Sequence, residues 1–483
     1  MPCLSALLCG ALALVAATPA DPPAAKNAIL FVGDGMGVST VSAARVFSVG
    51  VDGQLTLDTL PFTALSRTWS SDYITPDSAG TMSAMITGSK TNSGIISLSA
   101  DTERNDFLQD GDGAVLPTLF ELAIAAGKRT GVVTTARVTH ATPAACYAHV
   151  NERGKEAAIA LQALPDQPAY NDALGPGLDV IMGGGRRFFV PRGTDDEEGS
   201  EGRRDDGLDL RAAFVDQGYR YVWNADQLAA SGPDDRPLLG LFESSHMEYE
   251  HDRPQDLGGE PSLTEMALKA LELLEGAEQG YLLMVEGGRI DHAHHGGNAY
   301  RALRETEQFD RALAAVLERV DLEDTLVLAT ADHSHVFAFG GYPLRPLDEL
   351  PYAPVSHPAG FAEHDDHHGL LNTAHHLTGS GQVVESVDTT GQPYTPLLYA
   401  NGPGYRGATR ANPWEDDFPG VTGRAVPGPT HPDYRQEAAV PLGSETHGGE
   451  DVALYAIGPG ASAVRGTQPN TAVFDVLRAA LGL

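Results

Sequence analysis

Five apolar runs spread along the chain constrain its fold more than any other feature. They are residues 28–32, 130–134, 281–285, 326–330 and 452–457. A continuous apolar run of this length is typical of a strand that is buried on both faces, as strands in parallel sheets are. Several of the runs end at once in glycine, acidic residues or histidine, which predicts tight turns carrying polar side chains.

Helical patterns lie between these runs. Residues 262–275 open with a capping box, in which Ser262 is followed three residues later by Glu265. Residues 300–320 carry leucine and valine at helical spacing, and residues 470–481 close the chain as a further helix. Strands that alternate with helices predict a doubly wound α/β fold, a mostly parallel sheet with helices on both faces. Ligands bind such sheets outside the carboxyl ends of the strands.

Two regions depart from this alternation. Residues 193–210 are acidic and rich in glycine, which favours a surface loop. Residues 341–445 are rich in proline, glycine and histidine and have few periodic runs, so we expect an inserted subdomain there. The α/β core is then formed by residues 21–340 and 446–483.

The N-terminus reads as an export signal. Residues 4–17 form an apolar run that is too short to span a bilayer and is followed by Thr-Pro-Ala-Asp, although no Lys or Arg precedes it. We therefore expect residues 1–20 to be a signal peptide and the protein to be secreted or periplasmic. No later segment is apolar enough to cross a membrane. Removal of the signal leaves Cys146 as the single cysteine, which excludes an intrachain disulfide.

The charge of the chain excludes some partners. It has 32 Lys and Arg against 65 Asp and Glu, a formal net charge of -33. Nucleic acid needs a basic surface, so it is not an expected partner. The acidity indicates a well-solvated surface, suited to high salt that screens self-repulsion. An anionic substrate would need local metal charge at its site.

Ser78 lies at the predicted start of a helix. It follows a Pro-Asp turn and precedes an apolar-periodic run, so its hydroxyl would lie near free backbone N–H groups that suit a phosphate-like anion. A free serine is a weak nucleophile that needs a base or a metal. The Gly-x-Ser-x-Gly nucleophile pattern is missing around Ser78. The alternative interpretation is that Ser78 only caps the helix.

Metal-ligand residues gather at the predicted strand ends. Zn²⁺ takes histidine nitrogen and carboxylate oxygen, whereas Mg²⁺ prefers carboxylate, hydroxyl and water. Two zinc ions about 3.5–4 Å apart would hold both the attacking and the leaving oxygen of an in-line displacement, and one could activate Ser78. Each residue alone is better explained by a solvated surface or a buried ion pair, but six or seven of them at the ends of separate strands are hard to explain as structure. The set is Asp34, Glu286, Asp291, His295, Asp332, His333 and His447.

These motifs resemble the alkaline phosphatase family, and most closely its animal type. The matching segments, in family order along nearly the whole chain, are residues 34–37, 76–81, 134–143, 286–295, 331–333 and 445–451. The resemblance implies a crown-like insertion at residues 341–445 and a homodimer formed through it. Together with the acidic charge, it indicates a secreted bacterial member adapted to salt.

The resemblance also implies the metal ligands. One zinc ion would be held by Asp291, His295 and His447, and a second by Asp34, Asp332 and His333. One magnesium ion would be held by Asp34, Thr142 and Glu286, with His140 beside it. A calcium ion is a further expectation, with ligands from Glu198, Phe242, Glu243 and Glu260. The histidine stretches 364–368 and 375–376 are better explained as an exposed loop.

The remaining implied roles concern phosphate. Ser78 would be the phosphorylated nucleophile and Arg153 the bidentate phosphate ligand. His292 would contact phosphate through water. His140 and His292 stand where some bacterial members have Asp and Lys.

The expected reaction is hydrolysis of phosphate monoesters in two in-line steps. Two alternatives stay open from the sequence. One is a related metal-dependent phosphodiesterase or sulfatase. The other is a non-catalytic, secreted, metal-binding protein with many weak sites and no need for Ser78.

Overall fold

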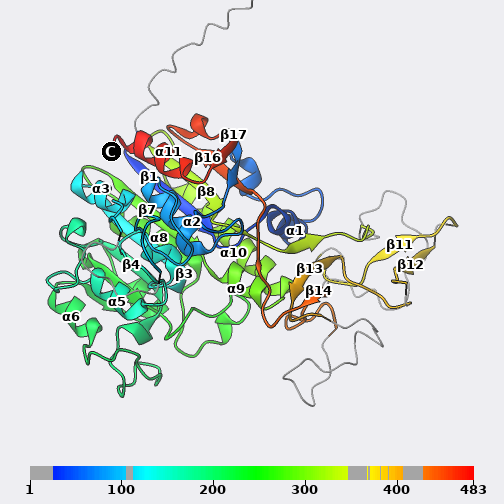
Figure 1. Cartoon of the computed structure of the whole chain (residues 1–483), viewed down its shortest axis with the longest axis horizontal. Coiled ribbons are helices and arrows are strands. Elements are labelled where there is room, and N and C mark those ends of the chain that lie inside the picture. Colours follow the sequence, from blue (N-terminus) through cyan, green and yellow to red (C-terminus); the bar gives the residue numbers. More distant parts are fainter. Residues whose placement is uncertain are drawn as a thin grey trace, which may run out of the picture.

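The computed structural model describes residues 25–104, 113–345, 367, 370–380, 382–389, 391–405 and 428–483. Within them, ten strands form one sheet in the order β17-β2-β16-β8-β1-β7-β3-β4-β6-β5 (Figure 1). In that order the strands are β17 (Gly466–Pro469), β2 (Phe62–Arg67), β16 (Val452–Ile457), β8 (Thr325–Ala331), β1 (Asn27–Gly33), β7 (Tyr281–Gly287), β3 (Arg129–Arg137), β4 (Val180–Gly184), β6 (Leu238–Leu241) and β5 (Arg220–Val222).

The five predicted strands lie in the central part of this sheet. They are β1, β3, β7, β8 and β16, and every residue of β1, β7 and β8 is buried. β1 pairs in parallel with both β7 and β8. Only β16 runs antiparallel to its neighbours, β8 and β2. The prediction of a doubly wound, mostly parallel sheet is confirmed.

Helices cover both faces of the sheet, because alternate residues of each strand enter two separate cores. Leu30 of β1 packs in the core that includes Met82 and Leu477, from α2 and α11. The next residue, Phe31, packs in the other core and meets the Phe309 ring of α10 edge-on at 5.5 Å. The helices are α1 (Val38–Val49), α2 (Ser78–Thr87), α3 (Leu119–Ala125), α4 (Ala141–Ala144), α5 (Glu156–Gln162), α6 (Leu210–Asp216), α7 (Ala225–Ala230), α8 (Leu263–Leu274), α9 (Arg289–His295), α10 (Ala299–Arg319) and α11 (Ala472–Leu481).

The predicted helices are confirmed with their signals. α8 begins after Ser262, whose hydroxyl accepts from the Glu265 N–H while the Glu265 carboxylate accepts from the Ser262 N–H. α10 and α11 match the predicted residues to within two positions at either end. The 193–210 segment is mostly exposed, as expected for a surface loop, but it also contains two buried charged residues, Asp196 and Arg204.

The region of the predicted insertion carries small sheets of its own. They project to one side of the main sheet (Figure 1). β10 (Phe337–Phe339), β13 (Leu397–Gly402) and β14 (Ala438–Pro441) form one, and β11 (His375–Leu377) pairs with β12 (Val383–Glu385). β9 (Ser334–His335) pairs with β15 (His447–Gly448) where this region joins the main sheet. Of the 364–368 stretch only His367 is described, and its ring stacks on Phe47 with centroids 3.7 Å apart.

The predicted signal peptide, residues 1–20, lies outside the described residues. Among the residues described, no helix is both long and apolar enough to span a bilayer. Cys146 is fully buried, as a small apolar residue would be.

Candidate active site

The predicted ligands meet at one edge of the sheet because of strand direction. Asp34 follows β1, Glu286 lies at the end of β7, and Asp332 follows β8. These three strands are parallel neighbours, so their carboxyl ends coincide. β16 runs the opposite way, so His447, which precedes it, reaches the same edge.

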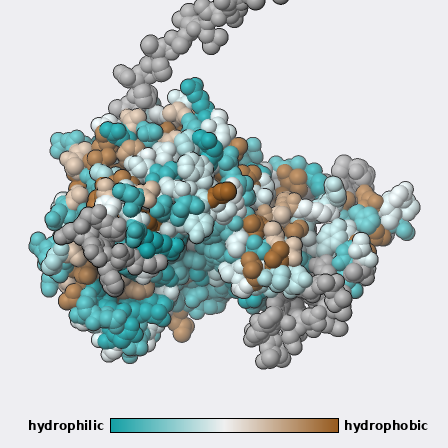
Figure 2. All heavy atoms as spheres, in the orientation of Figure 1, coloured by the Kyte–Doolittle hydropathy of each residue, from teal (hydrophilic) through white to brown (hydrophobic). Residues whose placement is uncertain are grey.

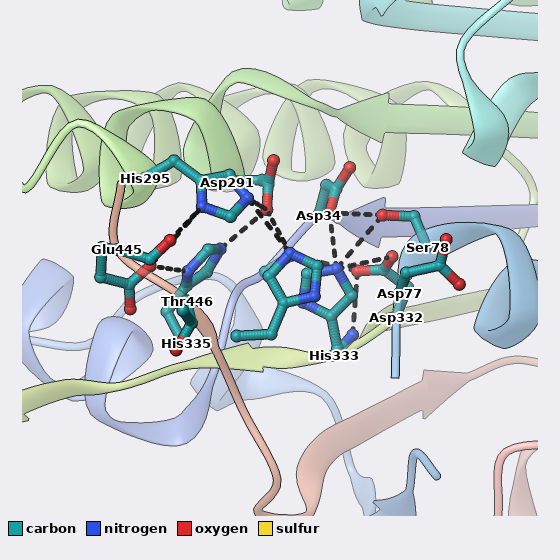
Figure 3. Close-up of polar contacts among 12 residues, drawn as sticks. Asp34, Asp77, Ser78, Asp291, His295, Asp332, His333, His335, Glu445 and Thr446 are labelled. Carbon is teal, nitrogen blue, oxygen red and sulfur yellow. Dashed lines mark hydrogen bonds and ion pairs between the residues drawn. The ribbon is translucent and has the colours of Figure 1, made fainter. Parts of the chain in front are cut away.

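Ser78 is the first residue of α2, and Asp77 rather than Ser78 is the helix cap. The Asp77 carboxylate accepts from the Gly80 N–H at 3.1 Å. Capping is therefore done by the neighbour, and the Ser78 hydroxyl points into the cluster of ligands (Figure 3). The first N–H groups of a helix have no partner within the helix, so they add positive potential beside this hydroxyl.

Ser78, Asp34 and Asp332 converge on the His333 ring (Figure 3). The His333 Nε2 atom lies 3.2 Å from Ser78 Oγ, 3.3 Å from Asp34 Oδ1 and 3.4 Å from Asp332 Oδ2. Four ligands bound tetrahedrally at about 2.0–2.1 Å from Zn²⁺ lie about 3.3 Å from one another. These side chains therefore fit the shell of one tetrahedral metal ion that includes the serine oxygen.

A second group of ligands has the same spacing. Asp291 Oδ1 lies 3.3 Å from His295 Nε2 and 3.4 Å from His447 Nε2, and the two histidine nitrogens are 3.1 Å apart. Asp291 and His295 stand on one face of α9, as their spacing of four predicts. A cation between these three atoms would bind both histidine nitrogens and the carboxylate oxygen at once. This group therefore also fits a tetrahedral metal ion.

A third group shares Asp34 with the first. Ligand atoms of Asp34, His140 and Glu286 lie within 4.8 Å of one another. Asp34 Oδ2, Glu286 Oε1, Thr142 Oγ1 and His140 Nδ1 are all buried without a hydrogen-bond partner. Buried polar atoms are nearly always paired, so four orphaned atoms here indicate a missing polar ligand. The oxygen-rich set suits a hard cation.

The electrostatics of the carboxyl groups point the same way. Burial raises the pKa of Asp34 well above its usual range, and the charges of Asp332 and Asp291 raise it further. Burial raises the pKa of Glu286 to about 8, against the opposing hydrogen bond from Thr134. Carboxylates buried side by side resist ionisation unless a positive charge compensates them. Divalent cations at these positions would supply that charge.

Arg153 lies beside the nucleophile. Its guanidinium donates to Asp77 Oδ2 at 2.9 Å and to His140 Nε2, also at 2.9 Å. Because a guanidinium is only a donor, His140 Nε2 must be the acceptor and Nδ1 must carry the ring proton. Burial and the charge of Arg153 lower the pKa of His140 well below its usual range, which keeps that ring neutral.

Two residues in the site had no signal in the sequence analysis. His335 lies in the two-residue strand β9, fully buried, with Nε2 2.8 Å from Asp291 Oδ1 and Nδ1 2.5 Å from Glu445 Oε2. It contacts the same Asp291 oxygen that faces His295 and His447, so it fixes the position of that ligand and lies within 4.8 Å of the other ligand atoms of the group. The sequence around His335 has no motif or periodic pattern that marks it as a site residue. The only available indication was its position two residues after His333.

His246 is the other residue that the sequence analysis missed. Its ring centroid is 4.0 Å from that of His292 and 5.3 Å from that of His140. It brings the loop after β6 against the two histidines that were predicted near phosphate. His292 itself lies on α9, with Nδ1 3.3 Å from a guanidinium nitrogen of Arg289.

The structure changes the composition of the predicted calcium group. Ligand atoms of Glu198, Glu243 and Asp256 lie within 4.8 Å of one another. Glu260 is not in this group, because its carboxylate accepts from the Glu248 N–H at 2.9 and 3.1 Å. Burial raises the pKa of Glu260 to about 9. Glu198 also contacts the buried guanidinium of Arg186, which competes with a cation for that carboxylate.

Known proteins resemble this chain along nearly its whole length. A family model described as alkaline phosphatase matches residues 25–483. The tissue-nonspecific isozyme of alkaline phosphatase from Homo sapiens is 37% identical over 486 residues, covering 94% of this chain and 83% of the relative. The isozyme of that name from Gallus gallus is 39% identical over 469 residues, covering 92% and 82%. The solved structure of Thermus thermophilus alkaline phosphatase matches with a TM-score of 0.65 and 29% identity over 96% of this chain and 93% of that one. The chain therefore belongs to the alkaline phosphatase family.

Proposed function

We propose that this alkaline phosphatase hydrolyses phosphate monoesters in two in-line steps, with Ser78 carrying the phosphoryl group between them. The observation that supports this best is the position of Ser78 Oγ. It lies 3.2 Å from His333 Nε2 and 3.4 Å from Asp34 Oδ1, at the start of α2. A serine hydroxyl at ligand distance from a metal-binding set has the activation that a free serine lacks.

The donor sets favour two zinc ions and one magnesium ion. Asp291, His295 and His447 form one mixed nitrogen and oxygen set, and Asp34, Asp332 and His333 form the other. Asp34, Thr142 and Glu286 offer only oxygen, which suits magnesium. When bound, these cations supply positive charge that acidifies a hydroxyl or water and neutralises phosphate oxygens.

The protein's own groups would then divide the work as follows. Ser78 Oγ attacks phosphorus and the alcohol departs on the opposite side. Water then attacks the phosphoserine from the side that the alcohol left, which returns Ser78 to its free form. Arg153 holds two phosphate oxygens through its planar fork, and Asp77 fixes the orientation of that fork. His140 and His292 border the same space.

The test is Ser78→Ala in the metal-loaded protein. We expect loss of nearly all hydrolysis of a chromogenic phosphate monoester, with unchanged metal content and thermal unfolding. Wild-type protein quenched in acid during turnover should carry covalent phosphate on Ser78 by mass spectrometry. Ser89→Ala, just past the end of α2, is the matched control and should keep full activity. Near-normal activity of Ser78→Ala would refute the assignment.

Three further expectations are proposals of the same kind. We propose a homodimer, tested by light scattering on the purified protein. We propose export through residues 1–20, tested by the N-terminal sequence of the mature protein. We propose a calcium site at Glu198 and Glu243, with Asp256 in the place expected for Glu260, tested by calcium content in Asp256→Asn.

A further inference from the structure

Two neighbouring arginines have no carboxylate partner in a chain that has twice as many acidic as basic residues. Most arginines of the described residues pair with Asp or Glu within 4.0 Å, as Arg137 does with Glu156. Arg187 and Arg203 make no such pair among the residues described. The side chain of Arg187 donates instead to the backbone carbonyl of Ser244 at 2.9 Å. Neither guanidinium group is therefore neutralised by a close ion pair among the described residues.

The two arginines line a pocket of about 500 Å³. Figure 2 shows hydrophilic residues gathered on this side of the molecule, around the place where Figure 1 labels α6. Arg192 also lines the pocket and pairs with the exposed Asp205. Glu201 is the one acidic residue that lines the pocket. The full lining is Arg187, Arg192, Ser200, Glu201, Gly202, Arg203 and Ser244.

Three arginines and one glutamate line this pocket, so its positive charges outnumber its negative charge. Burial lowers the pKa of Arg187, and the charges of Arg203 and Arg137 lower it further, while the charges of Glu156 and Glu243 oppose the change. Cations held together without a counter-ion repel, and a bound anion would relieve that repulsion. Planar guanidinium groups and the Ser200 and Ser244 hydroxyls are donors of the kind that bind phosphate oxygens.

Two residues that line the pocket lie beyond the carboxyl ends of parallel strands, on the edge of the sheet that also carries the catalytic metal ligands. Arg187 lies three residues after the end of β4, and Ser244 lies three residues after the end of β6. β4 is three strands from β1, after which Asp34 follows, so strands about 4.8 Å apart place the ends of β4 and β1 about 14 Å from each other. A line of contacts connects them, because Arg137 at the end of β3 touches His246, and His246 packs on His292.

We propose that this arginine pocket binds a second phosphate group, at the far end of an elongated substrate whose first phosphate group lies at Ser78. The preferred substrates are then phosphate esters with two phosphate groups separated by a spacer. This inference rests on the proposed function for the first phosphate group. It adds a separate site for the second.

The experiment uses a series of linear alkanediol bisphosphates and the matching alkanediol monophosphates. For the metal-loaded enzyme, we expect kcat/KM of the bisphosphate to exceed that of the monophosphate by about tenfold once the spacer bridges the two regions, as charge-assisted hydrogen bonds allow. In the double variant Arg187→Gln, Arg203→Gln, that ratio should fall to about the statistical factor of two at every length. The control, Arg319→Gln with Arg478→Gln, removes two exposed positive charges elsewhere and should keep the wild-type ratio.

Other outcomes would overturn the proposal. An equal loss for monophosphates and bisphosphates would mean general attraction of anions. If the wild type bound free inorganic phosphate more tightly than the double variant did, but its preference for bisphosphates did not depend on spacer length, the pocket would be an independent anion site.

Binding separates this proposal from the proposed function. Calorimetry with a bisphosphate on the Ser78→Ala background needs no turnover, and it should show about tenfold weaker binding when Arg187 and Arg203 are replaced. No hydrolysis of any ester by wild-type enzyme would refute the proposed function. Unchanged binding in this comparison would refute the second site.

Discussion

Replacing Glu305 by Gln should make the protein more resistant to alkaline unfolding. Glu305 lies on α10, only 4% exposed, and its carboxylate accepts from the Glu250 N–H. Burial raises the pKa of this carboxyl group from 4.5 to about 7, although the Glu250 N–H and the charge of Arg289 oppose the change. No metal ligand is in contact with it among the described residues, so its titration can be followed apart from the active site.

The size and sign of the effect follow from linkage. The folded state holds the proton more tightly than the unfolded state does, so the contribution of Glu305 to stability is fully present below pH 4.5 and is lost as pH rises through about 7. The pKa of the carboxyl group differs by about 2.5 between the folded and unfolded states. At 1.36 kcal/mol for each pKa unit, this corresponds to about 3 kcal/mol of stability. Gln has the same shape and an oxygen acceptor but no charge, so the variant avoids this loss.

The assay is urea unfolding of the wild type and of Glu305→Gln at pH 5.5 and pH 9, both loaded with metal. About one of the 2.5 pKa units is already lost at pH 5.5, so we expect the stability of the variant relative to the wild type to increase by about 2 kcal/mol from the lower to the higher pH. Metal effects common to both proteins cancel in this comparison. Glu318→Gln, an exposed residue of the same helix, should show almost no change. Equal pH dependence of Glu305→Gln and wild type would refute the reasoning.

Three other perturbations test the site. His335→Ala removes the 2.8 Å contact to Asp291 and should weaken zinc binding about 10- to 100-fold, measured by competition with a chromogenic chelator, while His375→Ala should not. Gly35→Ala should destabilise the protein by about 2 kcal/mol or more in urea unfolding, since φ is +69° and a Cβ would lie 2.4 Å from the His335 ring. Unchanged stability would contradict that packing. Removing the metals should lower the melting temperature more at pH 9 than at pH 7, because the pKa of Glu286 is about 8 and its stabilising proton is lost across that interval. Adding back zinc and magnesium should restore the melting temperature. If metal removal lowered the melting temperature equally at both pH values, buried carboxylates would not be the cause.

The central strands could be predicted because burial on both faces leaves unbroken apolar sequence. The outer strands lacked that signal. β2 alternates between buried and exposed residues, and β4 and β6 are short and contain glycine. Their pairing depends on neighbours that are distant in the chain, which local patterns do not contain.

The residues of the site also differ in whether a local sequence pattern could predict them. Asp291 and His295 were predictable because four residues make one helical turn. Glu260 and Asp256 were not distinguishable, since the segment around them has little regular structure and spacing says nothing about which carboxylate turns inward. His335 was not predicted because it contacts a metal ligand, Asp291, that is distant in the sequence. Contacts between distant residues are defined only in the folded protein.

The short ladder between β9 and β15 has a consequence for how this family can diversify. His447 pairs with His335, and Gly448 with Ser334, so the chain leaves the main sheet and returns to it at one closed point. The insertion between those two strands therefore has both its ends fixed beside the metal ligands. Closing a longer loop costs only about 0.6 kcal/mol for each doubling of its length. Provided that Glu445 keeps its contact with His335, the part of this insertion distant from the ladder can therefore be lengthened or shortened while the reactive centre keeps its geometry.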